Sequence, residues 1–309
     1  MRTIVTALWI SLLLASSALG QLVASRPPDG LAVSTGNLYF TSHDAAGATV
    51  WRTSQTSVPG QESVLFWEAG ARFGDIAFAQ INGAFFGFFF AQKGNVVTIR
   101  RVPLTGGNAV VIATVTDVDI VNTHQNLATD GVNVYWQDAG AIHKVPVGGG
   151  AIAVLDQTQA NAPTAGIDLR NGVITYASVN DIRFVPVGGA TTAPSVRTIA
   201  HASTTVTALS AGASGVFWGE RNGAVRVKAS GSATQTLPFP STLMATSIAS
   251  DGAAVAWTRC LGQCELVRFP LLSGNVVPIA PNAFGIHITP TKTLFWADSA
   301  GVHRRGFNQ

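Results

Sequence analysis

An aromatic residue ends a short apolar segment seven times along the chain, at a nearly regular spacing. The seven aromatics are Phe40, Phe88, Trp136, Tyr176, Trp218, Trp257 and Trp296. Trp136 and Trp296 are 160 residues apart, which is four steps with a mean of 40. A repeat of roughly 40 to 45 residues is typical of a four-stranded propeller blade. The spacing therefore predicts a seven-bladed β-propeller, with the second unit as its most irregular part.

Each unit can be divided into strands. A short alternating run precedes each aromatic segment, and most runs are joined to it by a pair such as Asn82-Gly83 or Asp130-Gly131, which favours a tight hairpin turn. A third strand follows the aromatic, and in three units it ends in Val-Pro before Gly-Gly. The glycine run 148–150 therefore belongs to a recurring strand-ending turn. A phosphate-binding loop would instead continue with Gly-Lys-Ser/Thr into a helix.

A fourth strand closes six of the seven units. The seventh unit lacks one, because the sequence given ends at Gln309, just after the third strand of that unit. The segment that begins at Gln21, QLVAS, is a spare strand. We therefore expect an all-β fold whose last blade is completed by the N-terminal strand, which removes the exposed edge of an open ring.

Residues 1–20 have the pattern of a secretory signal peptide. Arg2 precedes an apolar run over residues 4–14, and small residues lead to Gly20, after which we expect cleavage. The apolar run falls short of the roughly 20 residues that span a bilayer, and no later segment is apolar for long enough. We expect a secreted or periplasmic protein in which residues 21–309 form a single propeller domain.

The charge pattern argues against a nucleic-acid partner. Without Arg2 the chain has 18 basic and 16 acidic residues, scattered along its length, so no basic surface is indicated.

No Gly-x-Ser-x-Gly or His-Glu-x-x-His motif occurs. We expect no cofactor, no metal and a monomeric protein.

Two cysteines, Cys260 and Cys264, lie in the segment RCLGQC. A redox pair has two intervening residues rather than three, and a metal site would need further ligands nearby. A local disulfide across a hairpin is the better interpretation in an oxidising compartment.

The segments DGVNVYWQDAGAIHKVPVGGG and TLFWADSAGVHRRG carry a resemblance. They resemble the YWTD-type propeller repeats of lipoprotein-receptor ectodomains, and resemble still more the exported bacterial proteins with such units. Trp136 and Trp296 keep the Trp-x-Asp core, whereas Trp218-Gly219-Glu220 and Trp257-Thr258-Arg259 depart from it. The receptor family usually has six blades beside disulfide-rich modules, so its ligands are not carried over. The resemblance implies that Asp138 and Asp298 tie neighbouring strands together.

Two polar residues interrupt a row of small ones on the predicted innermost strands. The third position of the seven runs is occupied by Ala32, Ala77, Ala128, Asp168, Leu209, Ala249 and His287. Asp168 and His287 would face the central channel, where they could act as acid and base. The alternative is that they bind channel water or turn backbone, as buried polar groups normally do.

The predicted binding residues lie at one face of the ring. Asp75 and Asn126 begin inner strands near the channel mouth, and the loops between second and third strands carry His43, Lys93, Glu220 and Arg221. Polar loops on a rigid scaffold commonly form a binding rim. A metal cluster of His43, His124 and His287 is a further alternative that no spacing rule supports.

The segment AFFGFFFAQ, residues 84–92, contains five phenylalanines. They either fill the space between blades, which we favour because large aromatics dominate cores, or form an exposed patch for a partner protein.

The sequence favours an exported, non-catalytic propeller that binds a protein or glycan partner through one loop face. The alternative is a channel-centred hydrolase or lyase that uses Asp168 and His287. A structural envelope protein without a small ligand is a third possibility.

Overall fold

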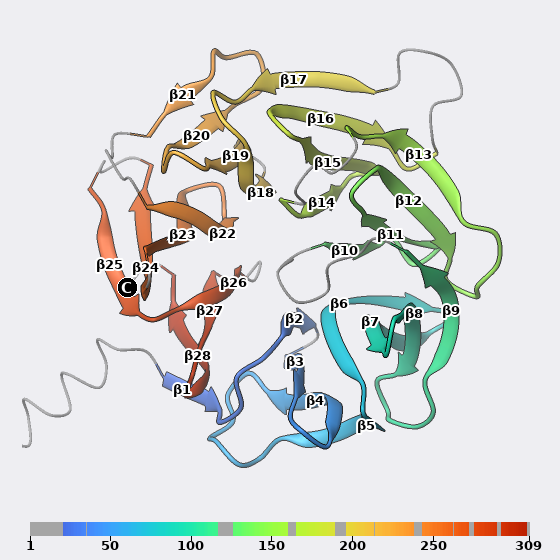
Figure 1. Cartoon of the computed structure of the whole chain (residues 1–309). Coiled ribbons are helices and arrows are strands. Elements are labelled where there is room, and N and C mark those ends of the chain that lie inside the picture. The colour runs from blue at the N-terminus through green and yellow to red at the C-terminus, as the bar shows by residue number, and fades with distance from the viewer. Residues whose placement is uncertain are drawn as a thin grey trace, which may run out of the picture.

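The computed structural model forms a closed ring of seven four-stranded antiparallel sheets (Figure 1). It describes residues 21–34, 36–116, 126–159, 165–188, 196–212, 214–237, 243–261, 263–271, 275–288 and 292–307. The predicted seven-bladed propeller is confirmed. The predicted signal peptide lies outside the described residues. The part of the chain that the structure describes contains no helix with the length and hydrophobicity needed to cross a membrane.

The first three blades follow one another along the chain, each from its inner to its outer strand. Blade 1 consists of β2 (Gly30–Ser34), β3 (Asn37–His43), β4 (Gly47–Ser54) and β5 (Ser63–Ala69). Blade 2 consists of β6 (Arg72–Ile81), β7 (Ala84–Lys93), β8 (Val96–Pro103) and β9 (Val110–Val115). Blade 3 consists of β10 (Leu127–Thr129), β11 (Asn133–Gln137), β12 (Ala141–Pro146) and β13 (Ala153–Gln157).

The next three blades repeat this order. Blade 4 consists of β14 (Ile167–Arg170), β15 (Val173–Ser178), β16 (Asp181–Pro186) and β17 (Arg197–His201). Blade 5 consists of β18 (Val206–Gly212), β19 (Gly215–Glu220), β20 (Val225–Lys228) and β21 (Gln235–Thr236). Blade 6 consists of β22 (Met244–Ser250), β23 (Ala254–Leu261), β24 (Gln263–Pro270) and β25 (Val277–Pro281).

Blade 7 joins the two ends of the described chain. It consists of β26 (Phe284–Ile288), β27 (Thr293–Asp298) and β28 (Gly301–Gly306), with β1 (Gln21–Ala24) as its outer strand. In the antiparallel pair β1–β28, Gln21 lies opposite Arg304, and the Arg304 Nε also donates to the Gln21 side chain at 3.0 Å. The side chains of Val23 and Ala24 are fully buried. The predicted closure by the N-terminal strand is confirmed.

The hydrophobic core consists of seven clusters, one between each pair of adjacent blades. One large aromatic from the second strand of each blade packs toward the preceding blade. These residues are Phe40, Phe89, Trp136, Tyr176, Trp218, Trp257 and Trp296, all almost completely buried. The ring is therefore held together chiefly by apolar contact between blades.

The sequence alignment was wrong by one residue in blade 2. Phe88 points toward blade 3, and Phe89 occupies the position that faces blade 1. A register irregularity between Phe73 and Ile76 accompanies this shift in the β6–β7 pair. Phe88, Phe89 and Phe90 are completely buried, so these three fill the space between blades, as favoured from the sequence.

Blade 5 contains a similar shift. Ser210 lies opposite Phe217, as Ala128 lies opposite Tyr135 in blade 3. The aligned inner position in blade 5 is therefore Ser210 rather than Leu209, and Leu209 is buried in the core between blades 4 and 5.

Polar side chains add hydrogen bonds from each of several blades to the next. The Thr41 hydroxyl donates to the Gly74 carbonyl at 2.7 Å, and the Gln137 amide donates to the Ala177 carbonyl at 2.8 Å. Both donors follow directly after the buried aromatic of their strand. Because both are buried, each bond satisfies a group that could not otherwise be solvated.

A Trp-Asp-His arrangement recurs in blades 3 and 7. Asp138 Oδ1 accepts from the backbone N–H groups of Gly140 and Ala141, both at 2.8 Å, and its Oδ2 lies 2.5 Å from His143 Nε2. The His143 ring stacks on Trp136 with 5.1 Å between ring centroids. Asp138 thus joins β11 to β12, as the resemblance implied.

Asp298 plays the same part in blade 7. Its Oδ1 accepts from Ala300 and Gly301, its Oδ2 lies 2.9 Å from His303 Nε2, and His303 stacks on Trp296. In both blades the aspartate fixes the turn between the second and third strands, while the histidine covers the buried tryptophan.

Candidate functional site

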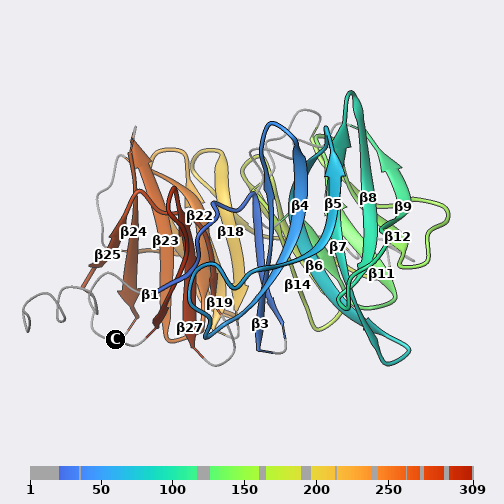
Figure 2. The same cartoon turned by 90° about the horizontal axis from the view of Figure 1, so that it is seen from below.

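The two edges of the ring differ in how they are built. At one edge, short turns join the first strand to the second, with positive φ at residues such as Gly131 (84°) and Asn171 (50°). The other edge, termed here the loop face, carries the turns between second and third strands and the crossings from one blade to the next. Figure 2 shows the strands running between these two edges. The opposite edge also carries the connections between third and fourth strands, such as residues 55–62 between β4 and β5. Connecting segments on a rigid scaffold commonly bind partners.

His43 lies at the loop face, where β3 ends. Its Nδ1 is 2.7 Å from Oδ2 of Asp29, a residue that precedes β2. Asp29 lines a narrow pocket between blades 7, 1 and 2, together with Asp75. Burial raises the pKa of Asp29 and outweighs the opposing effects of His43 and Arg72.

Asp75 is a buried acid with a strongly perturbed pKa. Its Oδ1 accepts from the backbone N–H of Ile76 at 2.9 Å, and its Oδ2 accepts from the N–H of Leu127 in blade 3 at 3.1 Å. Burial raises its pKa to about 7, and these backbone hydrogen bonds only partly offset that effect. Loss of solvent penalises the charged form of a buried carboxyl group in this way.

Asn126 lies beside this group and is completely buried. Its side-chain amide donates to the Gln137 carbonyl at 2.7 Å, and its side-chain oxygen accepts from the Gln137 N–H at 3.2 Å. The structure therefore brings His43, Asp75 and Asn126 to neighbouring positions around the inner strands. Of these three, His43 is the one exposed to solvent.

Two further predicted binding residues, Lys93 and Arg221, lie in blades 2 and 5. Lys93 ends β7, has a side chain 59% exposed, and its Nζ is 3.4 Å from Glu68 Oε1 of blade 1. Arg221 is exposed in the turn after β19. Both cations are accessible to a partner at the loop face.

Glu220 has a different environment. Its side chain is completely buried, its Oε1 lies 2.5 Å from Arg226 Nε, and it accepts hydrogen bonds from Trp218 and Ser203. These contacts hold the turn that presents Arg221. Glu220 is thus buried below the loop face, where its contacts stabilise the turn after β19.

Asp168 and His287 belong to blades 4 and 7, with blades 5 and 6 between them on the shorter way round the ring. Asp168 Oδ1 accepts from Arg170 Nε at 3.1 Å, and its Oδ2 accepts from the Ala211 N–H of blade 5 at 2.9 Å. Burial raises the pKa of Asp168. Asp168 therefore links β14 of blade 4 to β18 of blade 5 through the Ala211 N–H.

His287 is partly exposed, but loss of solvent still lowers its pKa to about 4. Among the described residues no hydrogen bond or ion pair joins His287 to Asp168. A general acid and a general base must each lie within hydrogen-bond reach of the proton that they transfer, and each of these two residues comes from a different blade. The hydrolase or lyase alternative stays a prediction for these two residues.

No group of three or more histidine, cysteine or acidic side chains suited to a metal ion occurs within the described ranges. His124, a member of the alternative metal cluster, lies outside those ranges.

The predicted disulfide is confirmed. Cys260 and Cys264 lie opposite each other near the ends of β23 and β24, and their sulfurs are bonded. The bond crosses the hairpin at the loop face.

The sequence analysis missed a polar pocket at the boundary of blades 3 and 4. It is lined by Gln157, Thr158, Gln159, Ser178, Val179, Asn180, Asp181 and Arg183. Two short segments about 20 residues apart in sequence form its walls, and the packing of blade 4 against blade 3 brings them together. A sequence signal did exist, since three carboxamide residues occur in these segments, but such residues are also ordinary in loops.

Comparisons with known proteins support the fold. No protein-family model matches the chain, and no curated protein matches it in sequence. A solved structure of a nidogen/laminin complex is similar, with a TM-score of 0.53 and 16% identity over 79% of this chain and 93% of the other.

Two bacterial structures are also similar. They are extracellular domains from B. thetaiotaomicron, one of a proposed one-component system (TM-score 0.63, 10% identity, 92% of this chain) and one of a proposed hybrid two-component system (TM-score 0.64, 9% identity, 93% of this chain). The match spans 39% of each of those chains. At these identities the likeness shows a shared β-propeller fold.

Proposed function

We propose that this protein is an exported, non-catalytic β-propeller that binds a protein or glycan partner through its loop face. The observation that carries this proposal is the presentation of accessible polar side chains by loops on a rigid ring. His43, Lys93 and Arg221 all lie at this face, on three different blades. The extracellular domains among the similar folds are consistent with export, and the nidogen/laminin complex is consistent with a protein partner.

Two features favour binding over catalysis. The perturbed acids Asp75 and Asp168 are both engaged by backbone N–H groups of the next blade. The exposed cations Lys93 and Arg221 lie at or beside the turns of the loop face, where charged groups accelerate association with a complementary partner. Glu220 contributes by holding the turn from which Arg221 extends.

The test uses residues 21–309, which contain every described blade, to capture a partner from the native secretome or from a glycan library. The captured partner is then measured against Arg221→Glu and against the matched control Arg197→Glu. Arg197 is also exposed, but it begins β17 at the opposite edge of the ring.

We expect Arg221→Glu to slow association at least severalfold, with a smaller effect at high salt, because exposed charges act mainly on the association rate. Arg197→Glu should leave the rate unchanged. Equal effects of the two variants would contradict a binding role for the loop face.

A further inference from the structure

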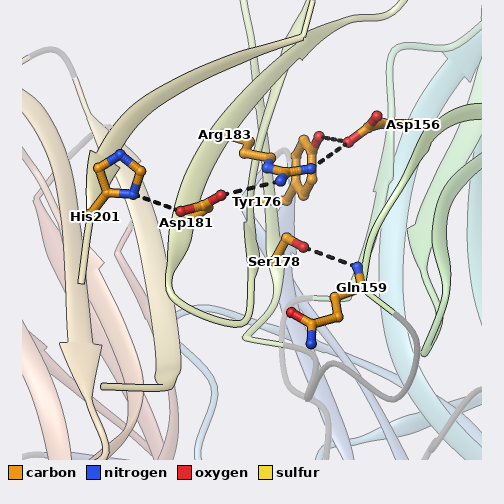
Figure 3. A network of polar contacts seen from close by, with 7 residues as sticks. All are labelled: Asp156, Gln159, Tyr176, Ser178, Asp181, Arg183 and His201. Atoms are coloured by element: carbon orange, nitrogen blue, oxygen red, sulfur yellow. Dashed lines mark hydrogen bonds and ion pairs between the residues drawn. The ribbon is translucent and has the colours of Figure 1, made fainter. Parts of the chain in front are cut away.

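We propose that the polar pocket between blades 3 and 4 binds an uncharged saccharide. This inference rests on the proposed function, because it names the chemistry of one partner that the loop face would take. The pocket has a volume of about 380 Å³, toward the lower end of the roughly 300 to 1,000 Å³ of small-molecule sites. Figure 3 shows its polar network, with Gln159 and Ser178 near the residues around Arg183.

The walls of the pocket offer hydrogen-bonding groups that the protein itself leaves unused. Gln157, Gln159 and Asn180 are exposed, and within the described part of the chain their side-chain amides have no hydrogen-bond partner. The Thr158 hydroxyl is buried without a partner in the same part of the chain. Each carboxamide both donates and accepts, and each sugar hydroxyl does the same. The walls therefore suit a ligand rich in hydroxyl groups.

The charges beneath the walls favour an uncharged ligand. The Arg183 guanidinium lies between two carboxylates, with Nη1 3.4 Å from Asp156 Oδ2 and Nη2 3.1 Å from Asp181 Oδ2. The Asp181 Oδ1 is also 2.7 Å from Nδ1 of the exposed His201. Because two carboxylates surround one guanidinium, a phosphate, sulfate or acidic sugar would meet no excess positive charge there.

Tyr176 also contacts the charged cluster around Arg183. Its hydroxyl donates to Asp156, and burial together with that carboxylate holds the pKa of Tyr176 well above its usual range. The phenol thus remains a donor, and it fixes one carboxylate beside Arg183. Groups held in place in this way lose little entropy when a ligand binds.

The turn that forms one wall is held in a strained conformation. Val179 has φ of 56°, and it is the only β-branched residue with positive φ among the described residues. Such backbone is unfavourable and clusters at binding and catalytic sites.

Three hydrogen bonds keep this turn in place. Val206 N–H donates to the Val179 carbonyl at 3.0 Å, and Ala202 N–H donates to the Asn180 carbonyl at 2.7 Å. On the other side, Gln159 N–H donates to the Ser178 hydroxyl at 3.1 Å. The strand crossing into blade 5 and the segment leaving blade 3 therefore fix both walls before any ligand arrives.

The test applies labelled residues 21–309 to an array of neutral and acidic glycans, and then titrates the best neutral glycan in solution by calorimetry. We expect binding to at least one neutral glycan, with affinity reduced about tenfold or more by Asn180→Ala and by Gln159→Ala. The matched control is Asn95→Ala, which makes the same change at an exposed position between β7 and β8 of blade 2. It should retain the wild-type affinity within about twofold.

Three results would overturn the inference: no binding to any neutral glycan, binding confined to acidic glycans, or wild-type affinity in both pocket variants. All the changed side chains are exposed, so thermal unfolding should confirm that the variants remain folded. A protein partner that is sensitive to Arg221→Glu and insensitive to Asn180→Ala would leave the proposed function standing without this pocket. Loss of both responses would remove both proposals.

Discussion

Replacing Asp75 by asparagine should remove a pH-dependent loss of stability. Burial raises the pKa of this carboxyl group in the folded protein from 3.8 to about 7. Between those two values the folded state binds a proton that the unfolded state has released. The free energy of unfolding therefore falls as the pH rises through this window, and the contribution of the extra proton is lost above about pH 7.

The size of this effect follows from the pKa. The interval from about pH 5 to the folded-state pKa is about two pH units. Each unit corresponds to about 1.36 kcal/mol. Wild type should lose about 2.7 kcal/mol through this group between about pH 5 and pH 8. Asparagine does not titrate, so the variant lacks this component. It also loses one acceptor for the N–H groups of Ile76 and Leu127, at a cost of about 1 to 3 kcal/mol that does not change with pH.

The assay is urea unfolding followed by tryptophan fluorescence at both ends of this pH range. The difference in unfolding free energy between Asp75→Asn and wild type should shift by about 2.7 kcal/mol in favour of the variant at the higher pH. Asp44→Asn, which removes an exposed carboxylate, serves as the control for the loss of one negative charge. Parallel pH profiles for wild type and Asp75→Asn would refute the reasoning.

Three further predictions concern other parts of the ring. Serine at both Cys260 and Cys264 should lower the free energy of unfolding by about 2 kcal/mol or less in urea titrations, because the closed loop is short. His143→Ala should cost about 1 to 3 kcal/mol by the same measurement, since it removes the partner of a largely buried carboxylate. Gly301→Ala should prevent normal folding in circular dichroism, because φ is 141° and the added Cβ would lie 1.9 Å from the Ala24 carbonyl oxygen.

Each of these has a clear contrary result. A large loss of stability without the disulfide would mean that it constrains more than the hairpin. The control for His143 is His201→Ala, since the His201 side chain is 77% exposed and should contribute little. A folded Gly301→Ala protein would show that β1 can move away from β28.

The number of blades and the closing strand could be predicted because they depend on residues that repeat. A buried aromatic is needed wherever one blade packs on the next, so Trp136 and Trp296 mark their blades without knowledge of any contact. The order of strands follows because neighbouring strands in sequence pair with each other. The spare strand at Gln21 was identifiable because the seventh unit lacked an outer strand.

Register could not be predicted where the repeat is irregular. In blade 2 three consecutive phenylalanines, Phe88 to Phe90, all suit a buried site, so hydrophobicity does not distinguish the one that faces blade 1. A strand shifted by one residue exchanges its two faces. Only the observed pairing of Ile76 with Phe89 settles the assignment.

The candidate site was harder to predict because burial and partners depend on neighbouring blades. Glu220 looks like an exposed loop residue in sequence, but Arg226 on the next strand lies beside it and the side chain is buried. Asp168 likewise finds its partner in Ala211, 43 residues away. Sequence position alone predicts which residues reach the loop face and leaves open which of them remain accessible.

The pairing of β1 with β28 also limits the order in which the protein can fold. The Arg304 side chain and its partner Gln21 are 283 residues apart in sequence, so this contact is among the last that a growing chain can make. Contacts of such long range are slow to form, because the entropy of closing a long loop is lost before any pairing compensates for it. Until then blade 7 has an unpaired outer edge, and a partly folded ring with such an edge is prone to pair with another molecule. We therefore expect the pairing of β1 with β28 to form late in folding.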